Sequence, residues 1–318
     1  MARRKLWIDD HTRNKDLSDK TYIVTGANSG VGLETSRQLI KQGAHVVMAC
    51  RRVEAGEEVA KAFNGMNGTY DVMRLDLADL SSVRAFTKTF LQKYDQLHGL
   101  DCNAGMVSMG RDVTRTKDGF EMSVGVSYFG HFLLTELLLE VLKKSAPSRI
   151  VILSSCVHAG KPDSRPYVHL DDINYNSRPF NGLNAYSEAK VANALYALEL
   201  SDRLKGTGVT AFAVHPGWAR SNFGKENVFM KVISPIMAPF IRTMTDSNEE
   251  SAQTSLHCLV SDQAIKHSGG YFSQSSVLYR DKECKEGGWP MVSPNPHAKD
   301  MQQAKKLVAM TYDMVGIN

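Results

Sequence analysis

The sequence predicts a single α/β domain built on a doubly wound parallel sheet. Two observations support this prediction. Short apolar runs alternate with longer amphipathic stretches along most of the chain, and the short runs are apolar throughout. This alternation is the order of βα units, and continuously apolar strands are typical of a parallel sheet that helices cover on both faces. No linker or repeat interrupts the order, so we expect an N-terminal arm (residues 1–18) and one domain (residues 19–318).

The predicted elements follow the apolar pattern along the chain. Strands are expected at residues 21–26, 45–50, 70–76, 97–102, 149–154 and 209–214. Helices are expected at residues 31–41, 81–94, 119–144 and 185–205, with a final helix ending near residue 315. In a sheet of this Rossmann type, ligands bind outside the carboxyl ends of the strands, near the point where the strand order reverses.

Composition and charge limit the functional classes. Hydrophobic residues make up 42% of the 318 residues, and the net charge of +4 comes from basic residues scattered among acids, so we expect no nucleic-acid partner. The five cysteines have no C-x-x-C spacing, which favours reduced thiols and no metal site. The polar N-terminus lacks the apolar core of a signal peptide, and no stretch approaches the roughly 20 apolar residues of a membrane span. A cytoplasmic protein is therefore expected.

The first predicted strand runs directly into a glycine-rich turn, T-G-A-N-S-G-V-G. Gly26 permits a tight turn, Gly30 lets backbone approach a pyrophosphate, and Gly32 permits close helix–strand packing. A tight βα turn without a ligand uses the same residues, but the position between a strand and a helix favours a dinucleotide site. The expected contacts are Gly26, Asn28, Ser29, Gly30, Val31 and Gly32.

The end of the second strand indicates which dinucleotide binds. An NAD enzyme usually has an acidic residue there for the ribose 2′-hydroxyl, whereas this chain has Arg51 and Arg52. A guanidinium suits the 2′-phosphate of NADP(H), with Arg51 as the main candidate. The alternative is two solvated arginines that begin a surface helix. Asp76, with Leu77 after the third strand, is either an adenine contact or a helix cap.

Tyr186 and Lys190 lie one helical turn apart on a predicted helix. A phenol titrates near pH 10, so a general acid/base working near neutrality needs a pKa lowered by about 3 units, roughly 4 kcal/mol. A nearby ammonium could provide much of this lowering. Ser155 ends the fifth strand, where its hydroxyl could hold a substrate carbonyl. Taken singly, the tyrosine–lysine pair is common on ordinary helices, and the serine could be simple turn chemistry.

Together these motifs resemble the short-chain dehydrogenase/reductase family in order and spacing. The resemblance implies hydride transfer with a nicotinamide cofactor, with Ser155 orienting the carbonyl, Tyr186 donating the proton and Lys190 binding the ribose and lowering the tyrosine pKa. It also implies that Asn103 stabilises the central strand beside the cofactor. Further cofactor contacts implied by the family motifs are Asn103, Ala104, Gly105, Pro216, Gly217 and Ser221.

The second half of the chain resembles the NADP-preferring retinol dehydrogenases within this family. The similar segments are residues 130–135, 191–193, 249–258, 268–273 and 292–294, and the final helix. This resemblance implies interconversion of lipophilic alcohols with their aldehydes or ketones, retinol and retinal among them. By analogy with the family, helices 119–144 and 185–205 could pair two copies into a homodimer.

Two segments depart from the family pattern. The family's fourth catalytic residue is an Asn, whereas this chain has Ser127, whose hydroxyl could still hold a relay water. Asp101 and Cys102 precede Asn103, where the family usually has an apolar residue and Asn. The first departure keeps open an NADP(H)-binding sensor or scaffold without turnover. A protochlorophyllide-reductase-like enzyme is a further alternative, although that family places a Cys after Pro-Gly where this chain has Trp218.

Residues 229–241 are apolar, rich in methionine and interrupted by Pro235 and Pro239. Methionine suits adaptable apolar pockets, so we interpret residues 222–245 as a lid over a lipophilic substrate. The segment 229–241 could also contact a membrane surface from the cytoplasmic side. The alternative is an ordinary core helix, which the two prolines disfavour.

Overall fold

Eight strands in the described part of the chain form one sheet, in the order β3-β2-β1-β4-β5-β6-β7-β8. The structure, a computed structural model, describes residues 4–108, 110–219 and 244–317. All neighbouring strands are parallel except β7 and β8. The strands are β1 (Thr21–Thr25), β2 (His45–Cys50), β3 (Thr69–Arg74), β4 (Gly99–Cys102), β5 (Ser148–Leu153), β6 (Val209–His215), β7 (Tyr271–Ser273) and β8 (Gly288–Met291). The predicted doubly wound sheet is confirmed, with an antiparallel edge strand added.

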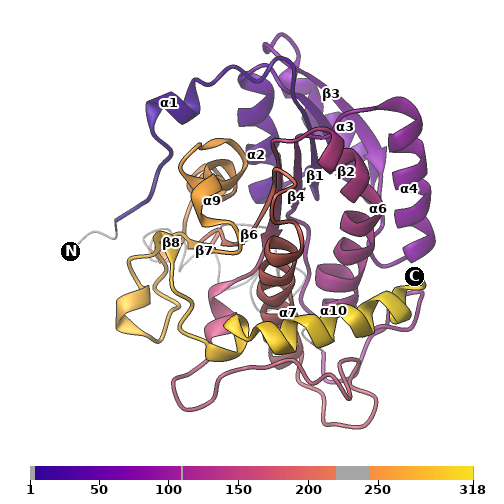
Figure 1. The fold of residues 1–318 in the computed structure, drawn as a ribbon, viewed down its shortest axis with the longest axis vertical. Helices are drawn as coiled ribbons and strands as arrows, with labels where there is room; N and C mark the ends of the chain where they lie inside the picture. The colour runs from indigo at the N-terminus through magenta and orange to yellow at the C-terminus, as the bar shows by residue number, and fades with distance from the viewer. Residues whose placement is uncertain (1–3, 109, 220–243, 318) are drawn as a thin grey trace, which may run out of the picture.

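Helices cover both faces of this sheet (Figure 1). One apolar core lies between the sheet and α4, α6 and α7, and a second core lies between the sheet and α2 and α9. The helices are α1 (Asp10–Arg13), α2 (Gly30–Lys41), α3 (Val53–Ala60), α4 (Leu80–Lys93), α5 (Met122–Val124), α6 (Gly130–Lys144), α7 (Gly182–Arg203), α9 (Asn248–Val260) and α10 (Met301–Val315). The predicted helices are confirmed, with ends shifted by a few residues.

Local chemistry sets several helix ends. Asp79 accepts hydrogen bonds from the first backbone N–H groups of α4, and Asp300 does the same for α10. Ser247 and Glu250 form a reciprocal capping box at the start of α9. Gly316 ends α10 in the left-handed conformation (φ 65°), which glycine adopts without steric cost.

The sequence pattern did not identify β7, β8 or α9 as elements. β7 has three residues, and β8 contains Gly288 and Pro290, so neither shows the alternation or apolar run of a strand. α9 is rich in Ser, Thr and Gln and is buried along most of its length. Its polar composition hides the helical period that an amphipathic helix would show.

The C-terminal helix α10 packs against α7 and reaches α6 (Figure 1). Tyr312 donates a hydrogen bond to Glu136 on α6 at 2.6 Å, and Arg203 at the end of α7 donates to the same carboxylate at 2.6 Å. The hydroxyl groups of Thr311 and Tyr128 lie 2.8 Å apart in the core. The chain's own C-terminal helix therefore covers part of the two helices that we expected to pair in a homodimer.

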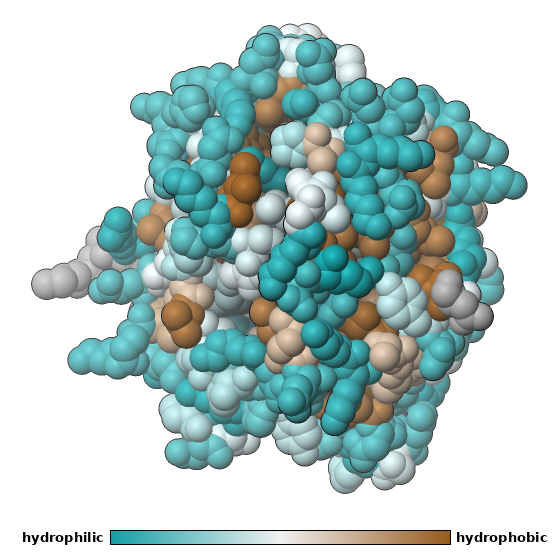
Figure 2. Space-filling view, in the orientation of Figure 1, coloured by the Kyte–Doolittle hydropathy of each residue, from teal (hydrophilic) through white to brown (hydrophobic). Residues whose placement is uncertain are grey.

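The helix Met122–Lys144 is long and apolar enough to span a membrane by length and composition. The expectation that no stretch has such a composition is therefore wrong for this helix. However, 78% of its most apolar window is buried within the fold, where these residues form part of the core against α4 and α7. On the face shown in Figure 2, apolar residues form scattered patches on a mostly hydrophilic surface.

Asp101 lies on β4 in the middle of the sheet. Its side chain is fully buried, and neither carboxyl oxygen has a hydrogen-bond partner among the described residues. Burial raises the pKa of Asp101 to about 8, because a carboxylate without solvent or a counterion is poorly stabilised. The folded chain therefore favours the neutral acid at this position.

We predict that Asp101→Asn makes the free energy of unfolding less sensitive to pH. A carboxyl whose pKa is raised on folding stabilises the fold fully below its unfolded pKa, near 4, and this stabilisation is lost as pH rises through about 8. Between pH 6 and pH 8 the free energy of unfolding of the variant should rise by about 2–3 kcal/mol relative to that of the wild type. Urea unfolding at the two pH values measures this, with Asp112→Asn as an exposed control. If the free energies of unfolding of the variant and the wild type differed by the same amount at both pH values, Asp101 would be ionised in the folded protein.

Candidate functional site

The strand order reverses between β1 and β4, and the glycine-rich turn lies at this point. Gly26 follows β1 with φ 66°, and a Cβ atom there would lie 3.1 Å from the Cβ of Ala104. At Gly32 a Cβ would lie 2.5 Å from Nδ2 of Asn103. The structure therefore brings together the glycine turn and the segment after β4, as the sequence predicts, and both glycines are needed for their close approach.

The N-terminus of α2 points into this turn with its backbone donors free of side-chain caps. Ser29 is the N-cap residue, but its side chain makes no capping hydrogen bond, and no acidic residue stands in the first turn. A helix N-terminus of this kind carries partial positive charge and uncapped N–H groups. It therefore fits a pyrophosphate, and Asn28, Gly30 and Val31 belong to the same turn.

Thr25 connects the two halves of this site. Its carbonyl accepts a hydrogen bond from Nδ2 of Asn103 at 2.7 Å, and its hydroxyl accepts one from the Ala104 N–H at 2.9 Å. The same hydroxyl lies 2.9 Å from Nε2 of His131, whose Nδ1 donates to the carbonyl of Ser127 at 3.2 Å. Burial lowers the pKa of His131 to about 3, so the imidazole is neutral near pH 7 and adds no charge to the site.

Arg51 and Arg52 are exposed directly after β2. The arginine ion pairs among the described residues involve neither of them, so both guanidinium groups are available to an anionic ligand. Arg52 also stands at the N-cap of α3, as the alternative of a surface helix expects. Asp76 accepts a hydrogen bond from the Ala78 N–H at 3.0 Å in a local turn, whereas Asp79 caps α4. The helix-cap alternative for Asp76 is therefore wrong, and buried Leu77 follows it.

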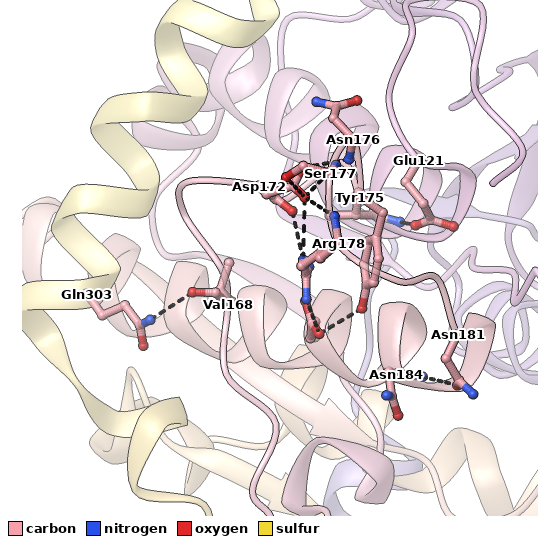
Figure 3. A network of polar contacts seen from close by, with 12 residues as sticks. Glu121, Val168, Asp172, Tyr175, Asn176, Ser177, Arg178, Asn181, Asn184 and Gln303 are labelled. Atoms are coloured by element: carbon pink, nitrogen blue, oxygen red, sulfur yellow. Dashed lines mark hydrogen bonds and ion pairs between the residues drawn. The ribbon is translucent and has the colours of Figure 1, made fainter.

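The start of α7, which carries Tyr186, is fixed by the loop before it (Figure 3). Arg178 binds Glu188 through two hydrogen bonds of 2.9 and 2.6 Å, and Tyr175 donates to the same carboxylate at 2.7 Å. Asn181 caps the helix by accepting from the Asn184 N–H. Because Glu188 lies between Tyr186 and Lys190 in the sequence, this ion pair holds the turn that carries both residues.

Lys190 is fully buried, and its Nζ donates to the Leu153 carbonyl at 2.8 Å while lying 5.3 Å from the centre of the Tyr186 ring. Burial lowers the pKa of Lys190 to about 7. The pKa of Tyr186 is raised, mainly by burial, although a hydrogen bond with Ser155 opposes the rise. This differs from the expected lowering, because burial of the phenol outweighs the hydrogen bond with Ser155.

Ser155 follows β5 and begins the short 3₁₀ turn Cys156–Ala159. The hydrogen bond between its side chain and Tyr186 shows that the structure brings the two predicted catalytic groups together. His158 fixes this turn, because its Nδ1 donates to the Ser155 carbonyl at 2.5 Å and its Nε2 lies 2.8 Å from the hydroxyl of Ser293. The sequence analysis missed His158, and no local motif marks it.

Ser127 lies in a turn of π-helix, Gly125–Phe129, that joins α5 to α6. Its hydroxyl is buried and has no hydrogen-bond partner among the described residues. A Cβ atom at Gly105 would lie 3.6 Å from this hydroxyl and 3.5 Å from Nζ of Lys190. The two groups therefore face one small space beside Gly105, and π-helical turns often occur at functional sites.

The segment after β6 brings a further group to the site. Pro216 and Gly217 lead to Trp218, whose N–H donates to the carboxylate of Asp246 at 2.9 Å. Asp246 was not predicted, and its contact with Trp218 joins positions that the sequence separates. Ser221 and most of the predicted lid, residues 222–243, lie outside the described residues.

The residues present fit a nicotinamide dinucleotide. The uncapped helix N-terminus suits its pyrophosphate, the two free guanidinium groups suit a phosphate on the ribose, and the unpartnered Ser127 hydroxyl faces Lys190 beside Gly105. No group of three or more His, Cys, Asp or Glu residues in the described ranges is placed to hold a metal ion.

Comparison with known proteins agrees with this geometry. A family model described as short chain dehydrogenase matches residues 20–167. The chain is 42% identical over 274 residues to retinol dehydrogenase 11 of Homo sapiens, covering 84% of this chain and 81% of that one. It is 40% identical over 307 residues to retinol dehydrogenase 12 of Homo sapiens, covering 96% and 89%.

Solved structures share the fold. A protein from Mycobacterium paratuberculosis superposes with a TM-score of 0.74 at 30% identity over 96% of each chain. The Pseudomonas aeruginosa RhlG/NADP complex superposes with a TM-score of 0.64 over 82% of this chain and 96% of that chain; at 18% identity this likeness concerns the fold alone. With the extent of the sequence match, the chain belongs to the short-chain dehydrogenase/reductase family, in which it resembles the retinol dehydrogenases, and it is an oxidoreductase that acts on CH–OH groups.

Proposed function

We propose that this protein is an NADP(H)-dependent oxidoreductase that interconverts a lipophilic alcohol and its aldehyde or ketone. The observation that carries the proposal is the convergence of Tyr186, Ser155 and Lys190 at the carboxyl edge of the sheet, beside Gly105. The relatives named retinol dehydrogenases support a lipophilic substrate. Leu183, which is 54% exposed, lies three residues before Tyr186 on α7 and therefore on the same side of the helix.

The reaction divides among these side chains. When bound, a nicotinamide dinucleotide would be held by the glycine turn and the segment 103–105, and it would supply the hydride that reduces the carbonyl carbon or take up the hydride of the alcohol. Ser155 holds the substrate oxygen through its hydroxyl, and Tyr186 delivers the proton that this oxygen needs as the carbonyl is reduced. Because burial raises the pKa of Tyr186, its phenol stays protonated at neutral pH. That is the form a proton donor needs when a carbonyl is reduced, whereas oxidation of the alcohol would begin from the phenolate.

The proton lost from Tyr186 must be replaced before the next turnover. Lys190, whose pKa burial lowers to about 7, can hold or release a proton near neutral pH. The buried hydroxyl of Ser127 faces the same space beside Gly105 and is free to hold a water. We assign Ser127 and Lys190 to this proton return, with the serine in the role that an Asn has in the family.

Cofactor preference rests on the end of β2. Arg51 is proposed to bind the 2′-phosphate of NADP(H), and Arg52 to stand beside it at the start of α3. The remaining proposed contacts are Gly26, Asn28, Ser29, Gly30, Val31, Gly32, Asp76, Leu77, Asn103, Ala104, Gly105, Pro216, Gly217 and Ser221. A cytoplasmic location, membrane contact through residues 229–241 and pairing into a homodimer stay predictions from the sequence.

Tyr186→Phe should abolish turnover while leaving cofactor binding intact, because the ring stays and the proton donor is lost. The purified protein is supplied with NADPH and a panel of retinal, a long-chain aldehyde and a steroid ketone, and oxidation of NADPH is followed by absorbance. We expect the wild type to reduce at least one substrate and the variant to lose about 100-fold or more in kcat. NADPH binding without turnover on any substrate would instead favour the sensor or scaffold. Undiminished turnover by the variant would contradict the assignment of Tyr186.

Arg51→Glu should reverse the cofactor preference. Loss of a charge-assisted hydrogen bond, worth roughly 1.5–3 kcal/mol, lowers kcat/KM for NADPH by about 100-fold and leaves the value for NADH unchanged or higher. Lys88→Glu on the exposed side of α4 makes the same change in charge away from the site and should alter neither value. A wild type that prefers NADH, or an Arg51→Glu variant that keeps its preference for NADPH, would show that Arg51 does not read the 2′-phosphate.

A further inference from the structure

The N-terminal arm reaches the loop that follows β6. Nζ of Lys5 forms an ion pair with Oδ1 of Asp246 and a second ion pair with Glu250 at 3.0 Å. The Asp246 side chain is fully buried, whereas 22% of the Lys5 side chain is exposed. A buried carboxylate needs a counterion and hydrogen bonds to offset its loss of hydration, and Lys5 provides the counterion.

The other carboxylate oxygen of Asp246 holds the turn after β6. Oδ2 accepts the hydrogen bond from the Trp218 N–H at 2.9 Å, and the Asp246 N–H donates to the Trp218 carbonyl at 2.8 Å. Gly217 has φ 90°, and a Cβ atom there would lie 2.5 Å from Oδ2. The carboxylate therefore packs directly against the turn, and the turn tolerates only glycine at residue 217.

The arm is well placed to hold Lys5 in this position. Leu6 exchanges two hydrogen bonds with the side chain of Gln274, its N–H donating and its carbonyl accepting, both at 2.8 Å. The Gln274 N–H in turn donates to the carbonyl of His215, the last residue of β6. Ile8 is buried and donates its N–H to the side chain of Gln253 on α9. The arm thus follows the same strand end that begins the turn.

We propose that Lys5 and Asp246 are positioning residues for the turn Pro216–Trp218, and through it for the nicotinamide end of the cofactor site. The inference rests on the proposed function in one respect, namely the assignment of this turn to the nicotinamide. The ion pair fixes the direction of the Asp246 carboxylate, and the carboxylate fixes the Trp218 N–H and the conformation of Gly217. The N-terminal arm is then a structural part of the cofactor site, although it lies outside the βα units.

Binding of two probes separates this role from a general effect on folding. NADPH contains the nicotinamide, whereas adenosine 2′,5′-bisphosphate carries only the adenosine and 2′-phosphate. Isothermal titration calorimetry measures the Kd of both probes. Lys5→Met in the full chain should raise the Kd for NADPH by about tenfold and change the Kd for the bisphosphate by less than about twofold. Lys15→Met is the matched control, because Lys15 pairs with Asp262 after the other end of α9, and should change neither value. Lys5→Arg keeps the charge and should bind both probes as the wild type does.

A second variant covers the case in which Lys5→Met does not fold because buried Asp246 loses its ion pair with Lys5. Lys5→Met combined with Asp246→Asn leaves no buried charge and keeps an amide oxygen for the Trp218 N–H. We expect NADPH binding alone to weaken again, but by about threefold instead of tenfold. An equal loss of affinity for both probes, or an unchanged affinity for NADPH in both variants, would overturn the proposal. Because binding is measured without turnover, failure here is distinct from failure of the proposed reaction.

Discussion

The hydrogen bonds of Thr25 hold the site together. At the end of β1, where the strand order reverses, its carbonyl and hydroxyl bind Asn103 and Ala104 after β4. Its hydroxyl also meets the neutral ring of His131, which reaches the backbone of Ser127. One residue thus joins the glycine turn, the segment beside Lys190 and the π-helical turn that carries Ser127. Buried polar groups tied in this way rigidify a site, because each would be costly to leave unpaired.

The catalytic side chains lie on elements whose positions are fixed by further hydrogen bonds and by an ion pair. Tyr186 and Lys190 come from α7, whose first turns are held by the Arg178–Glu188 ion pair and by the bond from Lys190 to the end of β5. Ser155 comes from β5, in a turn fixed by His158. Proximity and orientation are therefore built into strand ends and a helix start, which is what hydride and proton transfer to one carbonyl group require.

Local motifs made much of this site predictable from the sequence. The glycine turn and the spacing of Tyr186 and Lys190 are properties of a few neighbouring residues, so the sheet and the reacting groups could be inferred. Contacts between distant residues could not. Lys5 and Asp246 are 241 residues apart, and His158 meets Ser293 across 135 residues. The pKa of Tyr186 was expected to fall because its spacing from Lys190 is visible in the sequence, whereas its burial is not.

The most direct test of this account is the affinity for NADPH of Thr25→Val, compared with Thr25→Ser. Valine has the shape of threonine but cannot accept from the Ala104 N–H or bond to His131, whereas serine can do both. By calorimetric titration, the account predicts that Thr25→Val weakens NADPH binding by about tenfold or more, equivalent to about 1.4 kcal/mol, and that Thr25→Ser binds as the wild type does. A folded Thr25→Val protein with unchanged affinity would contradict the claim that Thr25 holds the cofactor site together.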